Sequence, residues 1–475
     1  MANENKLQAI ISHCKEYGFV FPSSEIYDGL GAVYDYGQNG AELKKNIKDY
    51  WWKSMTQLHD YIVGIDAAIF MHPTTWKASG HVDNFSDPMI DNKDSKKRYR
   101  VDHLIEAYAE QLAPDASAAL LQSMEQLIAA DDFAGLKNLI DTNKIKCSVS
   151  GTCNWTDVRQ FNLMFGTQLG SVAEESSEIY LRPETAQGIF VNFLNVQKTG
   201  RMKIPFGIAQ IGKAFRNEIV ARGFIFRMRE FEQMEMQFFV RPGTQQEWYQ
   251  YWKEARMQWH LSLGISPDKY RFHDHVKLAH YADAACDIEY DFPMGFKELE
   301  GIHSRTDFDL KNHQQFSGKK LTYFDTELNQ HYIPYVVETS IGLDRTFLML
   351  LSEAYQEEDL STEEKQDARV VLKLPAMLAP YKLAILPLLK KDGLPEIAKE
   401  LMAECRGSFK CFYEEKDAIG KRYRRMDAIG TPFCVTIDHQ TKEDGTVTIR
   451  HRDSMLQERV ALKDIKQIVL NAVQY

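Results

Sequence analysis

The 475-residue sequence has no long hydrophobic run and no basic leader. Its most apolar window, Val370 to Leu389, contains three prolines and two lysines, a mixture that a membrane span tolerates poorly. The first residues lack an apolar segment behind a basic start and so differ from a signal peptide. We therefore expect a cytoplasmic protein with no membrane partner.

Cysteine is scarce, and basic residues are outnumbered by acidic ones. The seven cysteines are odd in number and scattered, which favours reduced thiols over a disulfide framework. The formal net charge of −10 argues against a general nucleic-acid binder, so we expect no DNA partner. This net charge does not exclude an enzyme that binds one RNA through local basic patches.

The length of the chain indicates more than one domain, because 475 residues are more than one ordinary hydrophobic core accommodates. Residues 102–150 are rich in Ala, Leu and Glu and predict a helical insertion. An acidic linker ends near Val370, and strand and helix patterns alternate beyond it. We predict a first domain over 1–370, with the insertion at about 102–150, and an α/β domain over 371–475.

The first chemically suggestive stretch is Phe215-Arg216-Asn217-Glu218, followed by further arginines at positions 222, 227 and 229. Arginine's planar fork binds phosphate oxygens bidentately and stacks on flat rings, so this pattern suits a polyphosphate site. On spacing alone, a solvated and salt-bridged sheet face explains the pattern equally well.

Two further stretches carry polar groups. In the first, Gly342-Leu343-Asp344-Arg345 follows Glu338, which suits a helix start lying against a ligand, although an ordinary helix cap reads the same way. The second is a set of three glutamates, Glu184, Glu235 and Glu338. If they converge, they form an anionic pocket for an ammonium group, whereas each one alone is better explained by a structural salt bridge.

In combination these stretches resemble class II aminoacyl-tRNA synthetases and, within them, the homodimeric type of glycyl-tRNA synthetase. The resemblance covers nearly the whole chain and is carried by long strings in order. They are IYDGLGAVYDYGQNG, WWKSM, HPTTWKASGHVDNFSDPM (similar to the family's first motif), WTDVRQFNLMF, YLRPETAQGIF, the second motif FRNEIVARGFIFRMREFEQME, DIEYDFPMGFKELEGIHSRTDFDL, the third motif VVETSIGLDR, and IGKRYRRMDAIGTPFCVTID.

The resemblance implies an α+β fold: a large antiparallel sheet with helices carries the active site, and an α/β anticodon-binding domain follows it. It implies that glycine attacks the α-phosphate of ATP to give glycyl-adenylate and pyrophosphate, and that glycyl passes to the 3′ end of tRNA(Gly). The expected partners are ATP, glycine, tRNA(Gly) and a second copy of the chain.

The resemblance also implies residue roles. Arg216 would grip the α-phosphate, Phe231 and Arg345 would cover the two faces of the adenine, and Arg227 would reach the outer phosphates. The expected catalytic residues are Arg216, Glu218 and Arg345. The full ATP-binding set is Arg216, Asn217, Glu218, Phe226, Arg227, Met228, Arg229, Glu230, Phe231, Glu298, Leu299, Gly342, Leu343, Asp344 and Arg345, with Mg²⁺ arriving on ATP and contacting Glu298.

Glycine has no side chain to recognise, so the implied selection works by excluding any Cβ from a tight pocket. No editing domain is needed. The expected glycine-binding set is Arg100, Glu184, Phe231, Glu232, Gln233, Met234, Glu235, Glu338, Thr339, Ser340, Ile341 and Gly342.

The basic run near the C-terminus is the expected tRNA contact: Lys421, Arg422, Arg424 and Arg425, with Tyr423 among them. As an isolated charge run it reads more readily as a solvated helix face, and only the implied anticodon-binding domain reverses that preference.

The chain departs from the family's pattern at two places. Thr339 stands where the third motif commonly has proline. Some relatives carry paired cysteines of zinc-ribbon type, but Asn92 and Ser95 stand near the first pair's place here, leaving only Cys147 and Cys153. Two thiolates do not complete a tetrahedral site, so we expect no zinc and no protein-only metal site. His273, His275, His280 and His303 are interpreted as structural for the same reason.

Two alternatives stay open from sequence. A synthetase-like accessory subunit would keep the fold without catalysis, but such paralogues usually lose motif residues that this chain retains. Another class II enzyme of the same branch, such as the prolyl, threonyl or seryl type, would need a zinc site, a side-chain pocket or a coiled-coil arm, and none is visible.

Overall fold

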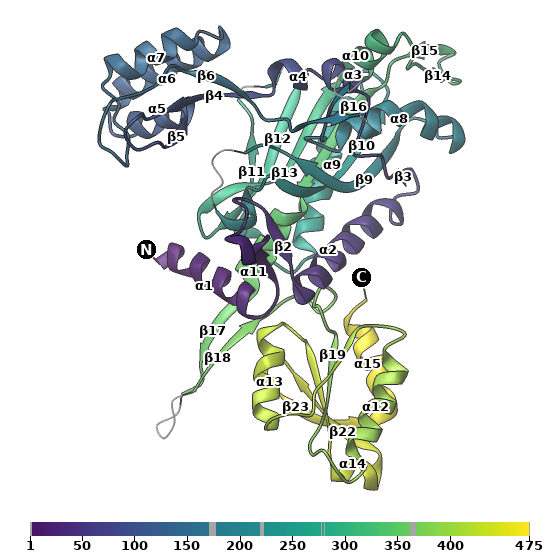
Figure 1. Cartoon of the computed structure of the whole chain (residues 1–475). Helices are drawn as coiled ribbons and strands as arrows, with labels where there is room; N and C mark the ends of the chain where they lie inside the picture. The colour runs from purple at the N-terminus through teal and green to yellow at the C-terminus, as the bar shows by residue number, and fades with distance from the viewer. Residues whose placement is uncertain are drawn as a thin grey trace.

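The fold of the chain is known from a computed structural model, which describes residues 2–170, 177–218, 223–276, 278–279, 281–361 and 367–474. Figure 1 shows a central sheet with helices, a helical lobe beside it, and a second sheet at the opposite end of the molecule. The predicted α+β class is confirmed, with an antiparallel-rich sheet in the larger part.

The central sheet has seven strands in the order β11-β12-β13-β16-β10-β9-β3. All neighbouring strands pair antiparallel except β3 with β9. The strands are β3 (Ile62–Gly64), β9 (Phe206–Phe215), β10 (Glu230–Val240), β11 (Tyr270–Asp274), β12 (Ala284–Phe292), β13 (Gly295–Thr306) and β16 (Tyr335–Gly342).

Strand alternation gives the central sheet two different faces. Met234, Met236 and Phe238 of β10 point into a large apolar core shared with three helices, α2 (Gln38–Thr56), α9 (Gln245–Leu261) and α11 (Leu343–Ala354). At one end of the other face, Phe239 packs under α8 (Ala186–Thr199) and α10 (Phe308–Ser317). The intervening polar residues of β10 therefore share the second face.

The helical lobe contains α5 (Val101–Ala109), α6 (Pro114–Ala129) and α7 (Phe133–Thr142). They pack with a three-stranded sheet of order β5-β4-β6, formed by β4 (Ser86–Asp91), β5 (Arg98–Arg100) and β6 (Arg159–Asn162). Ile90, Val101, Leu136, Ile140 and Trp155 belong to a core separate from that of the central sheet. The lobe therefore packs around its own apolar interior.

The second sheet has the order β20-β19-β21-β22-β23, with β19 parallel to both of its neighbours. Helices cover both of its faces (Figure 1). The elements are β19 (Leu383–Pro387), α12 (Leu394–Cys405), β20 (Cys411–Tyr413), α13 (Ile419–Ala428), β21 (Phe433–Ile437), α14 (His439–Asp444), β22 (Thr446–His451), β23 (Gln457–Ala461), η4 (Leu462–Asp464) and α15 (Ile465–Ala472).

Shorter elements complete the described chain. They are α1 (Ala2–Glu16), the pair β1 (Val20–Pro22) and β2 (Tyr34–Tyr36), η1 (Glu25–Tyr27), α3 (Pro73–Ala78), α4 (His81–Asn84), the pair β7 (Gly166–Leu169) and β8 (Ser177–Tyr180), η2 (Phe224–Phe226), η3 (Pro267–Lys269), the pair β14 (Tyr323–Asp325) and β15 (Gln330–Tyr332), and the pair β17 (Tyr355–Asp359) and β18 (Ala368–Leu372). None of the described helices is both long and apolar enough to span a membrane.

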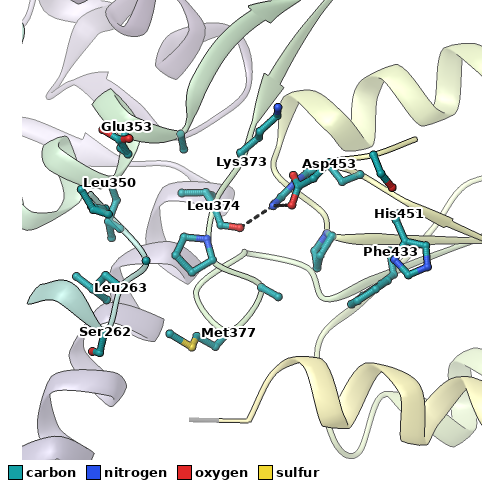
Figure 2. Close-up of a pocket in the computed structure, with 18 residues that line it drawn as sticks. Ser262, Leu263, Leu350, Glu353, Lys373, Leu374, Met377, Phe433, His451 and Asp453 are labelled. Atoms are coloured by element: carbon teal, nitrogen blue, oxygen red, sulfur yellow. Dashed lines mark hydrogen bonds and ion pairs between the residues drawn. The ribbon is translucent and has the colours of Figure 1, made fainter. Parts of the chain in front are cut away.

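The two sheets meet across a junction that contains a cavity of about 560 Å³ (Figure 2). Arg452, buried beside it, donates hydrogen bonds to the carbonyls of Leu374 and Gly430, both at 2.8 Å. Arg369 of β18 contacts Asp427 of α13 at 3.1 Å and the carbonyl of Arg452 at 2.9 Å. Buried polar contacts of this kind fix the second sheet against β18 and the segment that follows it.

Candidate active site

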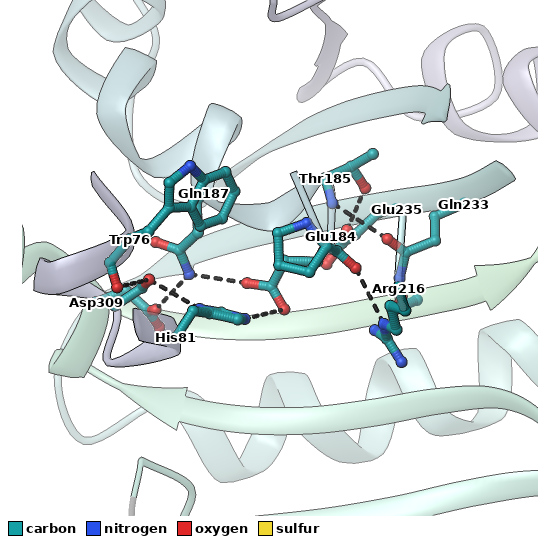
Figure 3. Close-up of polar contacts among 12 residues, drawn as sticks. Trp76, His81, Glu184, Thr185, Gln187, Arg216, Gln233, Glu235 and Asp309 are labelled. Atoms are coloured by element: carbon teal, nitrogen blue, oxygen red, sulfur yellow. Dashed lines mark hydrogen bonds and ion pairs between the residues drawn. The ribbon is translucent and has the colours of Figure 1, made fainter. Parts of the chain in front are cut away.

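Three glutamates from three separate segments meet on the polar face of the central sheet. Glu184 precedes α8, Glu235 lies on β10 and Glu338 on β16 (Figure 3 shows the first two). The Gln237 side-chain amide donates to Glu235 at 3.0 Å and to Glu338 at 2.6 Å, which joins the two strands. All three carboxylates are buried or nearly so. The site is therefore strongly anionic and largely shielded from water.

Glu338 and Glu184 each have cationic or histidine partners. Arg305 contacts both oxygens of Glu338, at 3.2 and 3.3 Å, and His303 lies at 2.8 Å. His81 lies 3.4 Å from Glu184. Burial opposes ionisation of both carboxyls, but Arg305 and His303 lower the pKa of Glu338, and His81 lowers that of Glu184 to about 2.

Glu235 is different, because no ion pair reaches it from the described residues. Among the described residues it accepts hydrogen bonds from the Thr185 hydroxyl and the Gln237 amide, and a hydrogen bond with the Glu338 carboxyl also raises its pKa. Burial, together with the charges of Glu338 and Glu184, raises its pKa well above the ordinary value. A cation entering the site would therefore gain most beside Glu235.

A second layer of polar residues holds this cluster. Arg305 also binds Asp309 through two hydrogen bonds of 2.8 and 3.0 Å. The Gln187 amide bridges Glu184 at 2.9 Å and Asp309 at 3.1 Å, and His313 bonds Gln187 at 2.7 Å. Fixed side chains of this kind preorganise a binding site.

Gly212 of β9, opposite Gln233, leaves room for a buried arginine beside the site. A Cβ at Gly212 would lie 2.2 Å from Nη2 of the buried Arg182. Arg182 itself donates to the carbonyls of Lys213 at 2.6 Å and Ala67 at 2.8 Å. Only glycine fits there while Arg182 keeps this position.

Two arginines border the glutamates on the same face. Arg216, at the end of β9, donates to the Pro183 carbonyl at 3.1 Å, and its guanidinium lies 5.2 Å from the centre of the Phe231 ring. Arg345, in the first turn of α11, lies 4.4 Å from the Phe226 ring centre and 3.1 Å from a Glu298 carboxylate oxygen. Planar cations beside aromatic rings suit a flat base and its phosphates.

The predicted site residues around Arg216 differ in the groups that they contact. Arg229 donates to the carbonyls of Glu218 at 3.0 Å and Gly31 at 3.2 Å, and so holds the turn that carries Glu218. Arg100 pairs with Asp102 at 2.6 Å and Asp87 at 3.1 Å, and Glu218 is among the charges that raise the pKa of Arg100. Arg227 is half-buried, Asn217 bonds the Leu163 carbonyl through its backbone, and Arg222 lies outside the described residues.

The polar face also holds Gln233, Ser340 and Gly342. Gln233 accepts the Thr185 backbone N–H at 3.2 Å and donates to the Ser340 hydroxyl at 3.4 Å. Gly342 precedes α11, and a Cβ there would touch the Arg345 side chain at 3.4 Å. These three residues lie between the glutamates and Arg345.

Several predicted site residues lie elsewhere. Glu232 and Asp344 both pair with Lys44 of α2, at 2.7 and 2.8 Å, on the far face of the sheet. Glu230 pairs with Lys213. The side chains of Met228, Met234, Leu299, Thr339, Ile341 and Leu343 are buried, all but Thr339 in the apolar core. Alternation explains the pattern, because a predicted run of consecutive strand residues always includes both faces.

Sequence reasoning missed the residues that hold the glutamates: His81, Arg182, Thr185, Gln187, Gln237, Arg305 and Asp309. One signal was available, since polar residues that alternate with Met and Phe along β10 need partners on a buried face. The sequence distance between Gln187 and Asp309 gave no indication of their contact.

The predicted tRNA-binding cations of α13 are not equivalent. Lys421 is exposed. Arg424 pairs with Asp367 at 3.0 Å, and Arg425 with Asp417 at 2.8 Å. Arg422 is buried and donates to three backbone carbonyls, so its guanidinium faces the protein interior.

Within the described ranges, no group of three or more His, Cys, Asp or Glu residues is arranged to hold a metal ion. Asn92, which stands near the place of the first zinc-ribbon cysteine pair, is fully buried. Its side-chain oxygen accepts from the backbone N–H groups of Asp94 at 3.2 Å and Ser95 at 2.9 Å. His273 and His275 pair with Glu289 and Asp287, and His303 with Glu338, whereas His280 lies outside the described part.

Comparison with known proteins finds three family domains in the chain. Residues 168–354 match the tRNA synthetase class II core domain (G, H, P, S and T), residues 87–119 and 113–163 match glycyl-tRNA synthetase insertion domain 1, and residues 382–472 match the anticodon binding domain.

Curated relatives match over nearly their whole length. The chain is 55% identical over 460 residues to the glycine–tRNA ligase of Chlorobaculum tepidum, covering 96% of this chain and 97% of the relative. It is 52% identical to that of Treponema denticola, with 96% and 94% covered, and 50% identical to that of Macrococcus caseolyticus, with 99% and 100% covered. The chain therefore belongs to the glycine–tRNA ligase family of class II aminoacyl-tRNA synthetases.

Proposed function

We propose that this chain activates glycine with ATP in the site above and transfers the glycyl group to tRNA(Gly). A glycine carboxylate oxygen attacks the α-phosphorus, an O–P bond forms, and the bond to pyrophosphate breaks. The 3′-terminal hydroxyl of the tRNA then attacks the acyl carbon, and AMP leaves. The observation that carries the proposal is the convergence of Glu184, Glu235 and Glu338 beside Arg216.

The glycine ammonium would lie beside Glu235, where the pocket has negative charge and no resident cation. Glu184, Glu338 and Ser340 would complete its surroundings, with Gln233 and the backbone up to Gly342 closing the pocket. Steric exclusion is the selective principle, because a tight and preorganised pocket can refuse an added methyl group although it could not reject a missing one.

ATP would lie along the arginine side of the site. Arg216 would oppose the charge that grows on the α-phosphate, and preorganised charges of this kind supply much of enzymatic rate enhancement. The adenine would lie between Phe231 and Arg345, with Glu218 near the base or ribose and Arg227 toward the outer phosphates. Glu298, whose carboxylate is half-exposed, would contact the Mg²⁺ that arrives with ATP and neutralises phosphate charge.

We also propose the organisation of the chain. Residues 1–370 would form the catalytic domain, with an insertion at about 102–150, and 371–475 the anticodon-binding domain. Separate apolar cores support this division, although Leu372, Leu374 and Leu378 pack in the core of the first part. A cytoplasmic homodimer is proposed as the working form. Exposed Ile26, Tyr27 and Leu30 near α2 support a partner surface, since they are 86%, 79% and 57% accessible.

The role of Arg216 is tested by replacing it. Arg216→Ala should reduce glycine-dependent ATP–pyrophosphate exchange by about a hundredfold or more, as loss of one preorganised charge at a reacting oxyanion does elsewhere. The melting temperature should hardly change, because within the described part of the chain the Arg216 side chain makes one hydrogen bond, to the Pro183 carbonyl. Arg406→Ala, which removes an exposed arginine far from the site, is the matched control. Near-parental exchange in Arg216→Ala would refute the assignment.

A further inference from the structure

A second cavity lies where α2 approaches the second sheet. Its volume is about 640 Å³, which is within the usual range for small-molecule sites. Four segments line it: α2, the residues before β19, the connection from α12 to β20, and the end of α15. Figure 1 shows α2 between the central sheet and the second sheet. None of the described residues that line this cavity belongs to the candidate active site.

The cavity contains a buried lysine, Lys382, at the start of the second sheet. Lys382 is 9% accessible, and its ammonium donates to the carbonyls of Met377 at 2.6 Å and Ala379 at 2.7 Å. Within the described part of the chain, no carboxylate forms an ion pair with it. Burial therefore lowers the pKa of Lys382 to about 7. A buried ammonium without an anionic partner destabilises the fold unless a ligand supplies the missing charge.

Three further lysines line the same cavity: Lys45 and Lys53 of α2, and Lys410 before β20. Glu42 is the one carboxylate among the described lining residues, and it pairs with Lys410 at 2.7 Å. Lys45 pairs with Asp49, which lies outside the lining. The lining therefore carries four ammonium groups and one carboxylate, on a chain whose net charge is −10. This local excess of positive charge attracts an anion.

Apolar side chains complete the lining of the cavity. They are those of Met377, Pro380, Phe409, Leu470 and Val473. Phe409 is buried in the apolar core of the second sheet, so its ring is held in place. A ligand that fills this cavity therefore contacts ammonium groups with one part and an apolar surface with another.

The charge of the lining restricts the class of the anion. A phosphate monoester carries about 1.5 to 2 negative charges at pH 7 and has three acceptor oxygens, whereas a carboxylate carries one charge and has two oxygens. A nucleic-acid backbone has one charge per phosphate, and a continuous strand would have to enter a cavity in which Lys382 is nine-tenths buried. The cavity therefore favours a small phosphate monoester.

The Ala379 carbonyl joins Lys382 to α2. Asn46 of α2 donates to the carbonyls of Leu378 at 3.0 Å and Ala379 at 3.1 Å, and the Ala379 carbonyl also accepts from Lys382. An anion bound at Lys382 would thus contact the segment that connects α2 with β19. A ligand that binds only the folded chain stabilises it by mass action, so occupation of the cavity should raise the melting temperature.

We propose that this cavity binds a small organic phosphate monoester. Its phosphate contacts Lys382 and the lysines of α2, and its apolar part lies beside Phe409. The site is separate from the one that would activate glycine, and the proposal does not depend on the proposed function.

The test is calorimetric titration of the full chain with phenyl phosphate, which combines a phosphate dianion with a flat apolar ring. Lys382→Met should weaken binding by about tenfold or more, because a hydrogen bond to a charged group is lost. Phenyl phosphate should also raise the melting temperature of the parental protein and hardly that of Lys382→Met. The matched control is Lys319→Met, which removes one exposed lysine elsewhere and should bind as the parental protein does.

Lys410→Met provides a second variant, because this half-exposed lysine can be replaced without opening a buried site. It should weaken binding by about threefold or more. Inorganic phosphate should bind the parental protein more weakly than phenyl phosphate does, since it has no apolar part. Equal affinities for the two probes would overturn the contact with Phe409.

Arg216→Ala separates this cavity from the candidate active site. Its affinity for phenyl phosphate should equal that of the parental protein. Loss of binding in Arg216→Ala but not in Lys382→Met would assign the probe to the active site and overturn the proposal. Equal affinity of Lys382→Met and Lys319→Met, or no binding to the parental protein at millimolar concentrations, would overturn it as well. Glycine-dependent ATP–pyrophosphate exchange should stay at the parental rate in Lys382→Met, so the proposed function is tested separately.

Discussion

At the scale of single residues, the decisive feature is the unequal support of three neighbouring carboxylates. Arg305 and His303 hold Glu338 ionised, and His81 does the same for Glu184, whereas Glu235 accepts from a hydroxyl and an amide. Uncompensated charge in a buried site costs stability and is kept where a ligand supplies the missing partner. We therefore propose that the partner which the Glu235 carboxylate lacks is the ammonium group of the ligand.

The raised pKa of Glu235 predicts how stability depends on pH. The folded chain retains this proton at pH values where the unfolded chain has lost it, so its contribution to stability falls as pH rises above the ordinary carboxyl range. Glu235→Gln cannot ionise and should escape this loss. Without substrate, its melting temperature should exceed that of the parental protein by more at pH 8 than at pH 5.

The control for this prediction is Glu254→Gln, an exposed carboxylate on α9 that should shift the melting temperature equally at both pH values. Glycine-dependent exchange should be lost in Glu235→Gln alone. A difference in melting temperature that does not grow with pH would show that Glu235 is ionised at little cost in the folded chain.

At the scale of elements, a network of side-chain hydrogen bonds fixes the turn around Asn92. The Asn92 side chain accepts from Asp94, Ser95 and Ser150 and donates toward Thr152. Beside it, hydrogen bonds from Ser150, Ser95 and Tyr99 lower the pKa of Cys147 to about 6 despite its burial. A small polar network thus fixes a turn that the apolar core of the lobe cannot fix by itself.

Asn92→Ala should therefore destabilise the helical lobe. Three part-buried donors, on Asp94, Ser95 and Ser150, would lose their acceptor, at up to about 1–3 kcal/mol for each group left unpaired. Limited proteolysis should cut first within the lobe, and the melting temperature should fall. Asn143→Ala, which removes one hydrogen bond at the end of α7, should have a smaller effect. Equal resistance of Asn92→Ala and the parental protein to protease would contradict this view of the turn.

The sequence predicted which strands and helices carry the site better than it predicted on which face of a strand each side chain lies. Long ordered motifs identified the fold and brought Arg216, Arg345 and the three glutamates to attention. Residues taken as consecutive strings, such as 231–235, could not all enter one pocket, because β10 alternates between the core and the site. Likewise nothing in the KRYRR string distinguished the buried Arg422 from the exposed Lys421, since that difference depends on carbonyls at the ends of β19 and β20.

At the scale of the whole molecule, a buried ionic junction holds the β17–β18 pair against α13 and the second sheet. Arg369 on β18 binds Glu358, Asp427 and the carbonyl of Arg452, and Asp427 also binds Arg450 through both oxygens. The junction contains no residue of the candidate active site.

Arg369→Met should reduce the free energy of unfolding by about 3 kcal/mol, the lower end for breaking a buried ion pair, because Asp427 keeps Arg450. Calorimetry should detect a lower melting temperature and less cooperative unfolding of the two parts. Arg424→Met, which breaks a half-exposed pair with Asp367, should cost less than about 1 kcal/mol. If the two substitutions cost the same, the junction is not fixed by Arg369.

The central claim is that the anionic pocket selects glycine for activation. The most direct measurement is amino-acid-dependent ATP–pyrophosphate exchange without tRNA, comparing glycine with alanine, serine and proline. Exchange with glycine alone is the predicted result. Exchange with a larger amino acid would contradict selection by exclusion around Glu235, and absence of exchange with all four from a well-folded protein would contradict catalysis itself.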